Sequence, residues 1–223
     1  MTMTILMAIP LQTRADDIPI NETTFPDENF RNWVLAQDYG QDGVLTEDEI
    51  AGVTQIRIYW YNIADLKGIE YFTALTELYC SGNQLTLLNV SQNTALTELW
   101  CEFNKLTSLD VSKNTALRQL NCYDNQLTSI DVSQNTALWY LNCSYNQLTS
   151  LDVSQNTALT ELYCYGNQIN ETEMGNLVES LPENYGKFYV KRLNDSDEQN
   201  VITFMQVAAA KAKGWTVYAS DGA

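Results

Sequence analysis

Residues 117–137 read LRQLNCYDNQLTSIDVSQNTA, and this stretch is one copy of a unit that recurs along the chain. Gapless copies occupy 75–95, 96–116 and 138–158, a shortened copy occupies 159–169, and an imperfect copy begins at Val53. A fixed period of 21 residues is the sequence signature of a solenoid, in which each unit buries its apolar side against its neighbours. We therefore predict a stacked repeat domain over residues 53–169.

The first half of each unit has the pattern of a short strand. In LTELYC, Leu78 and Cys80 are expected to face the interior, and Glu77, Tyr79 and Ser81 to face outward, because alternate side chains of a strand point to opposite faces. The unit LxxLxCxxNxL also matches the leucine-rich-repeat pattern. The sequence thus predicts an α/β leucine-rich-repeat solenoid with a parallel β-sheet on its concave face.

All five cysteines of the chain occupy the same position of the repeat, namely Cys80, Cys101, Cys122, Cys143 and Cys164. Equivalent residues of an in-register parallel stack lie about 4.7–4.9 Å apart, so we expect one buried column in which cysteine acts as a small apolar residue. Disulfides are an alternative because the expected spacing allows them, but the number is odd and parallel side chains are poorly oriented for bridging. A linear column also cannot supply four tetrahedral ligands to zinc.

An asparagine follows three residues after each cysteine, at Asn83, Asn104, Asn125, Asn146 and Asn167. We expect these amides to satisfy backbone groups of adjacent coils where the chain turns. Leu85, Leu88 and Val90, with their copies, are expected to fill the rest of the core. Asp110, Asp131 and Asp152 are expected to face solvent on the convex side.

The combination LTxLxCxxNxLTxLDVSxNTA resembles the 21-residue repeats of the internalin J type of bacterial surface protein. It is also similar to related secreted leucine-rich-repeat proteins of gut bacteria. The resemblance covers residues 53–169 and implies a bacterial extracellular protein whose repeat face contacts another macromolecule. It also implies a ladder of reduced cysteines in place of disulfides.

Composition excludes several classes of function. The chain of 223 residues has 28 acidic and 12 basic residues, a net charge of −16 and no histidine. Basic patches for nucleic acid or anionic membranes are not expected, and histidine-dependent triads and zinc sites are excluded. No apolar run is long enough to insert into a membrane. We expect a secreted or cell-surface monomer without enzymatic activity.

The outward positions of the strands vary between copies, whereas the scaffold positions barely change. These outward positions are rich in Tyr and Trp mixed with acids, which is typical of interface hot spots. We predict that the face binds a protein partner; a carbohydrate partner, a ligand-free spacer role and mere strand surface are the alternatives. The predicted binding residues are Arg57, Tyr59, Glu77, Tyr79, Glu98, Trp100, Glu102, Tyr123, Tyr140, Glu161, Tyr163 and Tyr165.

Glu77 and Glu98 are the candidates for catalysis by two carboxylates. Their expected separation of one coil is near that of a retaining glycosidase pair. They are nevertheless expected on an open sheet without a cleft, so we predict no catalytic residues.

The N-terminal region is predicted to comprise two parts. Residues 1–15 resemble the remains of a signal peptide without its basic start, the alternative being a native N-terminus. Residues 16–52 are expected to form a helical cap. Within it, DYGQDGVLTEDE resembles an EF-hand loop that places Asp38, Asp42 and Glu49 as calcium ligands, although Gly40 supplies no side chain at the third position. Thr46 to Glu49 also forms a capping box, so weak calcium binding and a vestigial site are both open.

Residues 170–223 are predicted to form a C-terminal cap of helix, strand, helix and strand that extends the parallel sheet. Asn170 is expected to begin the first helix, and residues 187–193 to form a strand. A loop is expected at 194–200, a helix at 203–213, and a last strand at 215–219. The arrangement resembles the C-terminal caps of the same bacterial proteins.

Overall fold

The computed structural model describes residues 17–192 and 198–220. The predicted signal-peptide remnant at 1–15 lies outside these residues, as does most of the loop predicted at 194–200. Within the described ranges, none of the helices is long and apolar enough to cross a membrane.

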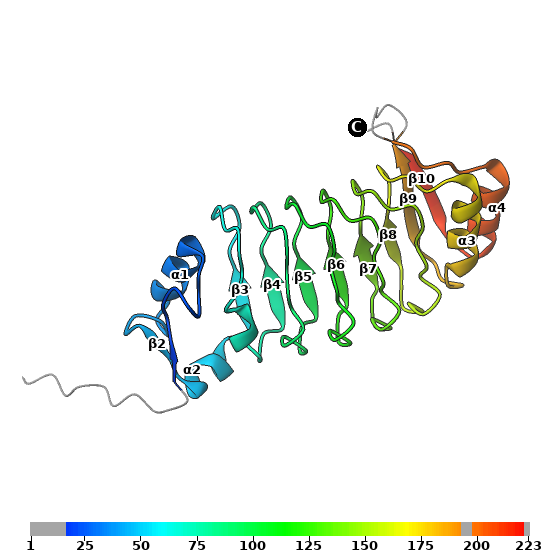
Figure 1. The fold of residues 1–223 in the computed structure, drawn as a ribbon. Helices are drawn as coiled ribbons and strands as arrows, with labels where there is room; N and C mark the ends of the chain where they lie inside the picture. Colours follow the sequence, from blue (N-terminus) through cyan, green and yellow to red (C-terminus); the bar gives the residue numbers. More distant parts are fainter. Residues whose placement is uncertain (1–16, 193–197, 221–223) are drawn as a thin grey trace, which may run out of the picture.

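The repeats form one long parallel sheet, as predicted (Figure 1). Its strand order follows the sequence without interruption. Equivalent residues pair between neighbouring coils, for example Leu78 with Leu99 and Leu99 with Leu120. The strands are β3 (Gln55–Arg57), β4 (Glu77–Tyr79), β5 (Glu98–Trp100), β6 (Gln119–Asn121), β7 (Tyr140–Asn142), β8 (Glu161–Tyr163), β9 (Lys187–Arg192) and β10 (Thr216–Ser220).

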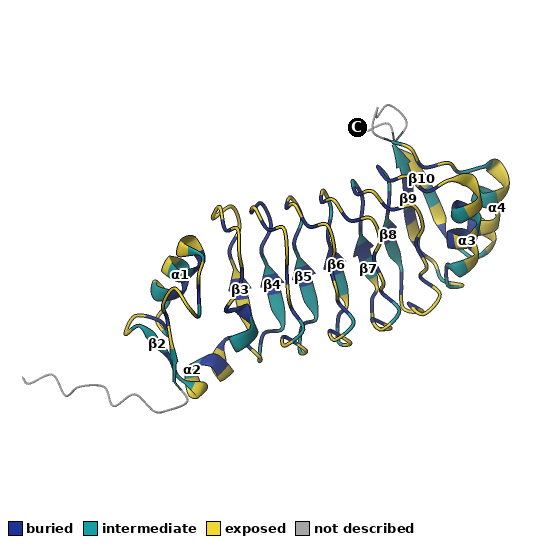
Figure 2. Cartoon of the chain, in the orientation of Figure 1, coloured by how far each residue is buried: buried dark blue, intermediate teal, exposed yellow. Residues whose placement is uncertain are grey.

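The inward residues form a continuous core under the sheet, which Figure 2 shows as dark blue segments in every coil. Leu78, Leu99 and Leu120 have no exposed surface, and neither do the five cysteines. All five cysteines are free, so the predicted column of reduced thiols is confirmed. Burial raises the pKa of each of these thiols, which keeps them protonated and apolar.

The asparagines after the cysteines form the predicted hydrogen-bond ladder. The amide of Asn125 donates to the carbonyl of Cys101 at 3.1 Å and to that of Cys122 at 3.2 Å, and its oxygen accepts from the backbone N–H of Leu106 at 2.9 Å. Asn200, in the C-terminal cap, continues the ladder by donating to Cys164 at 2.8 Å. The turn of each coil is therefore tied to the coil before it.

A second asparagine ladder lies on the far side of the core and was missed in the sequence. It comprises Asn93, Asn114, Asn135 and Asn156, all fully buried. Asn114 donates to the carbonyl of Val90 at 3.0 Å and to that of Asn93 at 2.9 Å. The sequence contains a signal for this ladder, because the NTA triplet that ends each full repeat never varies.

The N-terminal cap covers the first coil with two helices, α1 (Glu28–Leu35) and α2 (Glu47–Gly52). Beside them lies a small two-stranded antiparallel sheet of β1 (Ile18–Pro19) and β2 (Val44–Leu45). Asp27 begins α1 by accepting from the N–H of Phe30 at 2.9 Å, and its second oxygen accepts from the N–H of Ala64 at 2.8 Å. One carboxylate therefore both starts the helix and fastens the cap to the first repeat. The predicted capping box at Thr46 and Glu49 is confirmed.

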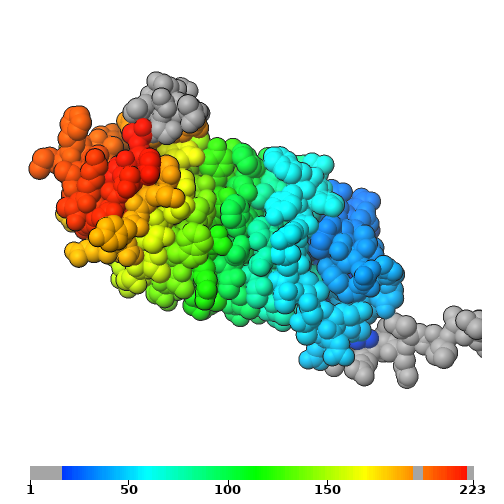
Figure 3. All heavy atoms as spheres, turned by 180° about the vertical axis from the view of Figure 1, so that it is seen from behind, coloured from blue at the N-terminus to red at the C-terminus, as the bar shows by residue number. Residues whose placement is uncertain are grey.

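A short 3₁₀ helix, η1 (Ile69–Tyr71), completes the first coil. The C-terminal cap has two helices, α3 (Glu171–Ser180) and α4 (Phe204–Ala212). The first begins at the predicted cap Asn170, and the second begins at Thr203, the first residue of the helix predicted at 203–213. Strands β9 and β10 pair in parallel with the repeat sheet, as predicted. Figure 3, seen from behind, shows the coils packed in sequence order between the two caps.

Candidate binding face

The predicted binding residues all lie on or directly after the strands, on the side of the sheet opposite the core. We call this side the sheet face. Arg57 and Tyr59 are exposed, and the other ten predicted residues are half-buried. The strand positions carry them because alternate residues of β3 to β8 point away from the core.

A row of rings runs along the sheet face, and we call it the central row. It comprises Tyr59, Tyr79, Trp100, Tyr140, Tyr163, Tyr189 and Tyr218. Neighbouring ring centroids lie 5.8, 6.3, 5.9, 5.5, 4.2 and 4.4 Å apart in that order. The row skips β6, where Trp100 stacks directly on Tyr140 at an interplanar angle of 13°. The aromatic surface is therefore unbroken from the first coil to the C-terminal cap.

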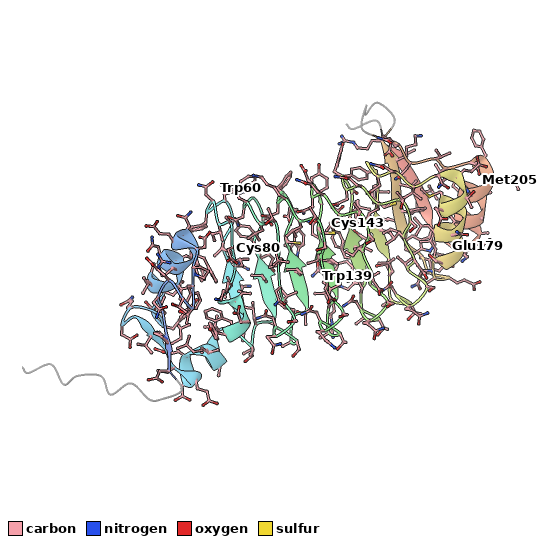
Figure 4. The ribbon with its side chains drawn as sticks, in the orientation of Figure 1. Trp60, Cys80, Trp139, Cys143, Glu179 and Met205 are labelled. Atoms are coloured by element: carbon pink, nitrogen blue, oxygen red, sulfur yellow. The ribbon has the colours of Figure 1, made fainter. Side chains whose placement is uncertain are left out.

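A second row, the rim row, lies at the turn after the strands. It comprises Trp60, Phe103, Tyr123, Tyr145 and Tyr165, with centroids 5.9, 5.2, 5.3 and 5.5 Å apart. Trp60 reaches Phe103 by lying across Gly82, where an added Cβ would be 2.2 Å from the indole. Figure 4 shows Trp60 at one end of the strands and Trp139 at the other.

Three members of the rim row have left-handed backbones. The φ angles are 60° for Trp60, 55° for Phe103 and 51° for Tyr145. The same position holds Gly82 and Gly166 in other coils, and glycine adopts this conformation without strain. A bulky residue there costs about 1–2 kcal/mol. These rings are thus held in place despite an unfavourable backbone.

The prediction that every alternate residue is open to solvent is wrong at three small side chains. Ser81 is 4% exposed, Asn121 is 6% exposed, and Ser144 is fully buried. Larger side chains at the equivalent positions of neighbouring coils cover them. Asn121, for example, lies beside Trp100. These residues form the floor between rings and are not contact residues.

Glu77 and Glu98 share one hydrogen-bond donor. The hydroxyl of Tyr79 lies 3.0 Å from an oxygen of Glu77 and 2.8 Å from an oxygen of Glu98. Gln55 donates to Glu77, and Gln119 donates to Glu98 at 2.7 Å. Burial and these two carboxylates raise the pKa of Tyr79, so its hydroxyl stays protonated as a donor. The pair is a hydrogen-bonded network on an open sheet.

Glu102 lies in the same part of the face and is half-buried. Its Oε2 is buried without a hydrogen-bond partner, and so is the indole Nε1 of Trp100. Burial raises the pKa of the Glu102 carboxyl, while hydrogen bonds from its own backbone and from Ser81 act in the opposite direction. An acceptor and a donor are therefore left unsatisfied in one region of the face.

The C-terminal part of the face neutralises its own charge. Lys187 pairs with Glu161 at 2.9 Å, and Glu161 also accepts from the hydroxyl of Tyr163 at 3.2 Å. Arg192 donates to the hydroxyl of Tyr145 at 2.6 Å and stacks over the rings of Tyr145 and Tyr165. Cations from β9 therefore hold this end of the surface together.

The side chains predicted as calcium ligands each have another hydrogen bond. Asp38 accepts from Gln41, Asp42 accepts from the N–H of Val44 at 3.0 Å, and Glu49 accepts from Thr46 in the capping box. Over residues 17–192 and 198–220, no three acidic, cysteine or histidine side chains come together as a metal site. Calcium binding at Asp38, Asp42 and Glu49 stays a prediction.

Several surface residues of the face were absent from the predicted set. Tyr189 and Tyr218 extend the central row from the C-terminal cap, and Trp60, Phe103 and Tyr145 build the rim row. Trp139 is 37% exposed and packs edge-on against Tyr140. Trp139 could have been found in the sequence, because the other full repeats have Thr or Arg at its position.

Comparison with known proteins gives concordant results. No known protein-family profile matches the chain. Internalin J of Listeria monocytogenes serotype 4b is 50% identical over 70 residues, which are 31% of this chain and 8% of internalin J. The chain therefore spans a small part of that relative's length.

Solved structures extend the likeness to the whole fold. The functional domain of InlJ from Listeria monocytogenes, described as including a cysteine ladder, is 37% identical with a TM-score of 0.71. The match covers 92% of this chain and 43% of that domain. An internalin C2 from the same species shares the fold at 20% identity and a TM-score of 0.60, with coverage of 94% and 100%.

These likenesses confirm two of the sequence predictions. The repeat with a buried cysteine every 21 residues is of the internalin J type, and the prediction that the chain is not an enzyme agrees with its likeness to internalin leucine-rich-repeat domains. The chain is therefore similar to internalin J in its leucine-rich-repeat fold and in its cysteine ladder.

Proposed function

We propose that this chain is a secreted or surface-exposed bacterial recognition protein that binds another protein through its sheet face. The observation that carries the proposal is the pair of aromatic rows, which line the surface where the repeats differ most from each other. Tyr and Trp are enriched in interface hot spots, where they contribute large contact area at low cost in conformational entropy. The likeness to internalins supports a location outside the bacterial cytoplasm.

Stacking between rings could by itself stabilise the sheet, since cross-strand aromatic pairs contribute about 0.2–1 kcal/mol each. That explanation does not account for the rim row. Trp60 is 68% exposed and Phe103 is 43% exposed, and both have strained left-handed backbones. A side chain that serves only stability gains little from such a position. Contact with a partner accounts for both the exposure and the strain.

The geometry favours a protein over a carbohydrate. Tyr163 and Tyr189 stack at 4.2 Å and 3°, and Tyr189 and Tyr218 stack at 4.4 Å and 10°. The ring faces that a sugar would need for stacking are thus occupied by neighbouring rings along this part of the row. A carbohydrate is the second candidate because the indole of Trp60 is largely exposed.

The test is quantitative capture of host-cell and bacterial surface proteins by the full chain. The sheet-face variant changes Tyr79, Trp100, Tyr123 and Tyr163 to serine. A matched control changes four exposed apolar residues elsewhere, namely Leu87, Tyr185, Phe204 and Met205, which are 66%, 96%, 95% and 80% exposed. Both variants must keep the circular dichroism spectrum of the parent chain.

A partner held by the parent and the control, but lost by the sheet-face variant, is the expected result. Loss of capture after glycan removal from the extract would favour the carbohydrate candidate. Equal capture by all three chains, or no capture, would contradict binding through the sheet face and favour a spacer.

A further inference from the structure

The two ends of the sheet face differ in whether their carboxylates form ion pairs. In the described residues, two ion pairs are present, Arg31 with Glu22 and Lys187 with Glu161. Neither involves Glu77, Glu98 or Glu102, which lie on and beside β4 and β5. We call the region from β3 to β6 the acidic half. Three carboxylates are therefore gathered there without an ion-pair partner among the residues that the structure describes.

Glu77 and Glu98 are close together, since one Tyr79 hydroxyl reaches both. Two negative charges at this separation repel each other, and the network around them supplies neutral donors only: one hydroxyl and two amides. A carboxylate can accept about four hydrogen bonds, so both retain free acceptor capacity. Arg57 stacks over the Tyr79 ring at 5.2 Å and does not form an ion pair with either.

Glu102 adds a third negative charge in a less favourable place. Its buried oxygen without a hydrogen bond is costly, because a buried unsatisfied acceptor loses the water that it had in the unfolded chain. Nearby aromatic rings, such as Trp100 in the same coil, lower the local dielectric and present the faces and edges that attract cations. A cation placed here would pair with the carboxylates and lie against the rings, and these contacts would offset its loss of hydration.

Solubility does not explain this arrangement. Asp110, Asp131 and Asp152 on the opposite side of the coils give the chain exposed negative charge, and each accepts from the N–H two residues later. Because these aspartates are exposed, water can fill their remaining acceptor positions. The sheet-face glutamates differ in being half-buried and incompletely paired.

We propose that the acidic half binds a basic segment of a protein partner, whose Lys or Arg side chains pair with Glu77, Glu98 and Glu102. This inference rests on the proposed function and names the chemistry of its partner. Tyr59, Tyr79 and Trp100 add cation–π contacts around the carboxylates. The charge of the segment complements the acidic half, while the C-terminal half, which has its own Lys187 and Arg192, contributes aromatic contact.

The experiment uses two variants with equal changes of net charge. One replaces Glu77, Glu98 and Glu102 with glutamine, and the other replaces Asp110, Asp131 and Asp152 with asparagine. The probe is a library of random peptides displayed on phage and selected on the parent chain. The tightest selected peptide is then synthesised, and its affinity for the three full-length chains is measured by calorimetry.

We expect Lys and Arg to be enriched among selected peptides. Affinity should fall at least about tenfold, or about 1.4 kcal/mol, for the glutamine variant and remain within about twofold for the asparagine variant. Binders without basic residues, no binders at all, or equal weakening of both variants would overturn the proposal.

The two proposals fail separately. If the partner captured from extracts is lost by the serine variant but held fully by the glutamine variant, the basic-segment proposal is wrong and the sheet face still binds protein. If basic peptides depend on the three glutamates while capture from extracts ignores the aromatic residues, the proposed function is wrong and the cation site remains.

Discussion

The acidic half and the C-terminal half of the sheet face are built on one backbone pattern, yet they differ in how their carboxylates are paired. In the C-terminal half, Lys187 neutralises Glu161. In the acidic half, Glu77 and Glu98 share a neutral donor. Bulky residues with left-handed backbones occur in both halves, at Trp60 and Phe103 in the acidic half and at Tyr145 in the C-terminal half. One repeat scaffold therefore carries a neutralised carboxylate at one end of the sheet face and carboxylates without an ion pair at the other.

The largest expected effect concerns the frame that both halves share. Asn125→Ala leaves the N–H of Leu106 and the carbonyls of Cys101 and Cys122 without their amide partner. Each stranded group costs about 1–3 kcal/mol, so we expect a loss of at least about 2 kcal/mol in the free energy of unfolding. Urea denaturation measures it.

The control for that experiment is Gln134→Ala, because Gln134 is exposed in the neighbouring turn. It should change stability by less than about 0.5 kcal/mol. Similar stabilities of the two variants would mean that the asparagine ladder does not hold the coils together.

Backbone strain in the acidic half should have a smaller effect on stability, in which a glycine variant is more stable than the alanine variant. At Phe103, with φ of 55°, glycine should be more stable than alanine by about 0.5–1 kcal/mol, because alanine keeps the left-handed strain. At Tyr123, which does not have a positive φ, alanine should be the more stable. Thermal unfolding of the four variants checks the reversal, and the same order at both sites would refute the strain.

The Glu102 carboxylate should make the free energy of unfolding depend on pH. Burial raises its folded pKa, because the ionised form is penalised in the native state. Stability is thus retained at low pH and falls as the pH rises through the raised pKa. We expect Glu102→Gln to stabilise the chain at pH 7, and the gain to shrink below the ordinary pKa of glutamate. Chemical denaturation at several pH values measures this, with Glu161→Gln, which removes an ion pair, as the contrasting variant.

The smallest effect concerns the cap beside the acidic half. If Asp38, Asp42 and Glu49 bind calcium with a millimolar dissociation constant, an equal calcium concentration stabilises the chain by about 0.4 kcal/mol. A thermal shift with calcium, absent with magnesium and absent after Asp38→Asn, is the expected result. No shift would leave Glu49 with its capping role alone.

Much of this molecule could be predicted from the sequence because it is periodic. Leu120 and Cys122 recur at the same spacing in all copies after the imperfect first one, which determines the strand, the register and the buried column. The caps followed from local signals, such as Asn170 before α3 and Thr203 before α4. These predictions depended only on interactions between residues that are close in the chain or separated by one coil.

The surface depended on interactions that spacing does not reveal. Ser144 is buried because its neighbours in adjacent coils are larger, and Trp100 reaches Tyr140 because Asn121 between them is short. Tyr189 and Tyr218 join the central row from outside the repeat. Asn200 continues the asparagine ladder from a position outside the 21-residue period. Side-chain size in neighbouring coils and the path of the cap set these features.

The most direct test of binding through the sheet face is hydroxyl-radical footprinting of the chain with and without the captured partner. Oxidation of Tyr59, Trp60 and Trp100 should fall on binding, because these rings lie in the two aromatic rows. Tyr185 and Phe204, exposed at 96% and 95% in the C-terminal cap, should oxidise at unchanged rates. Protection of Tyr185 and Phe204 with unchanged oxidation of the rows would contradict the account.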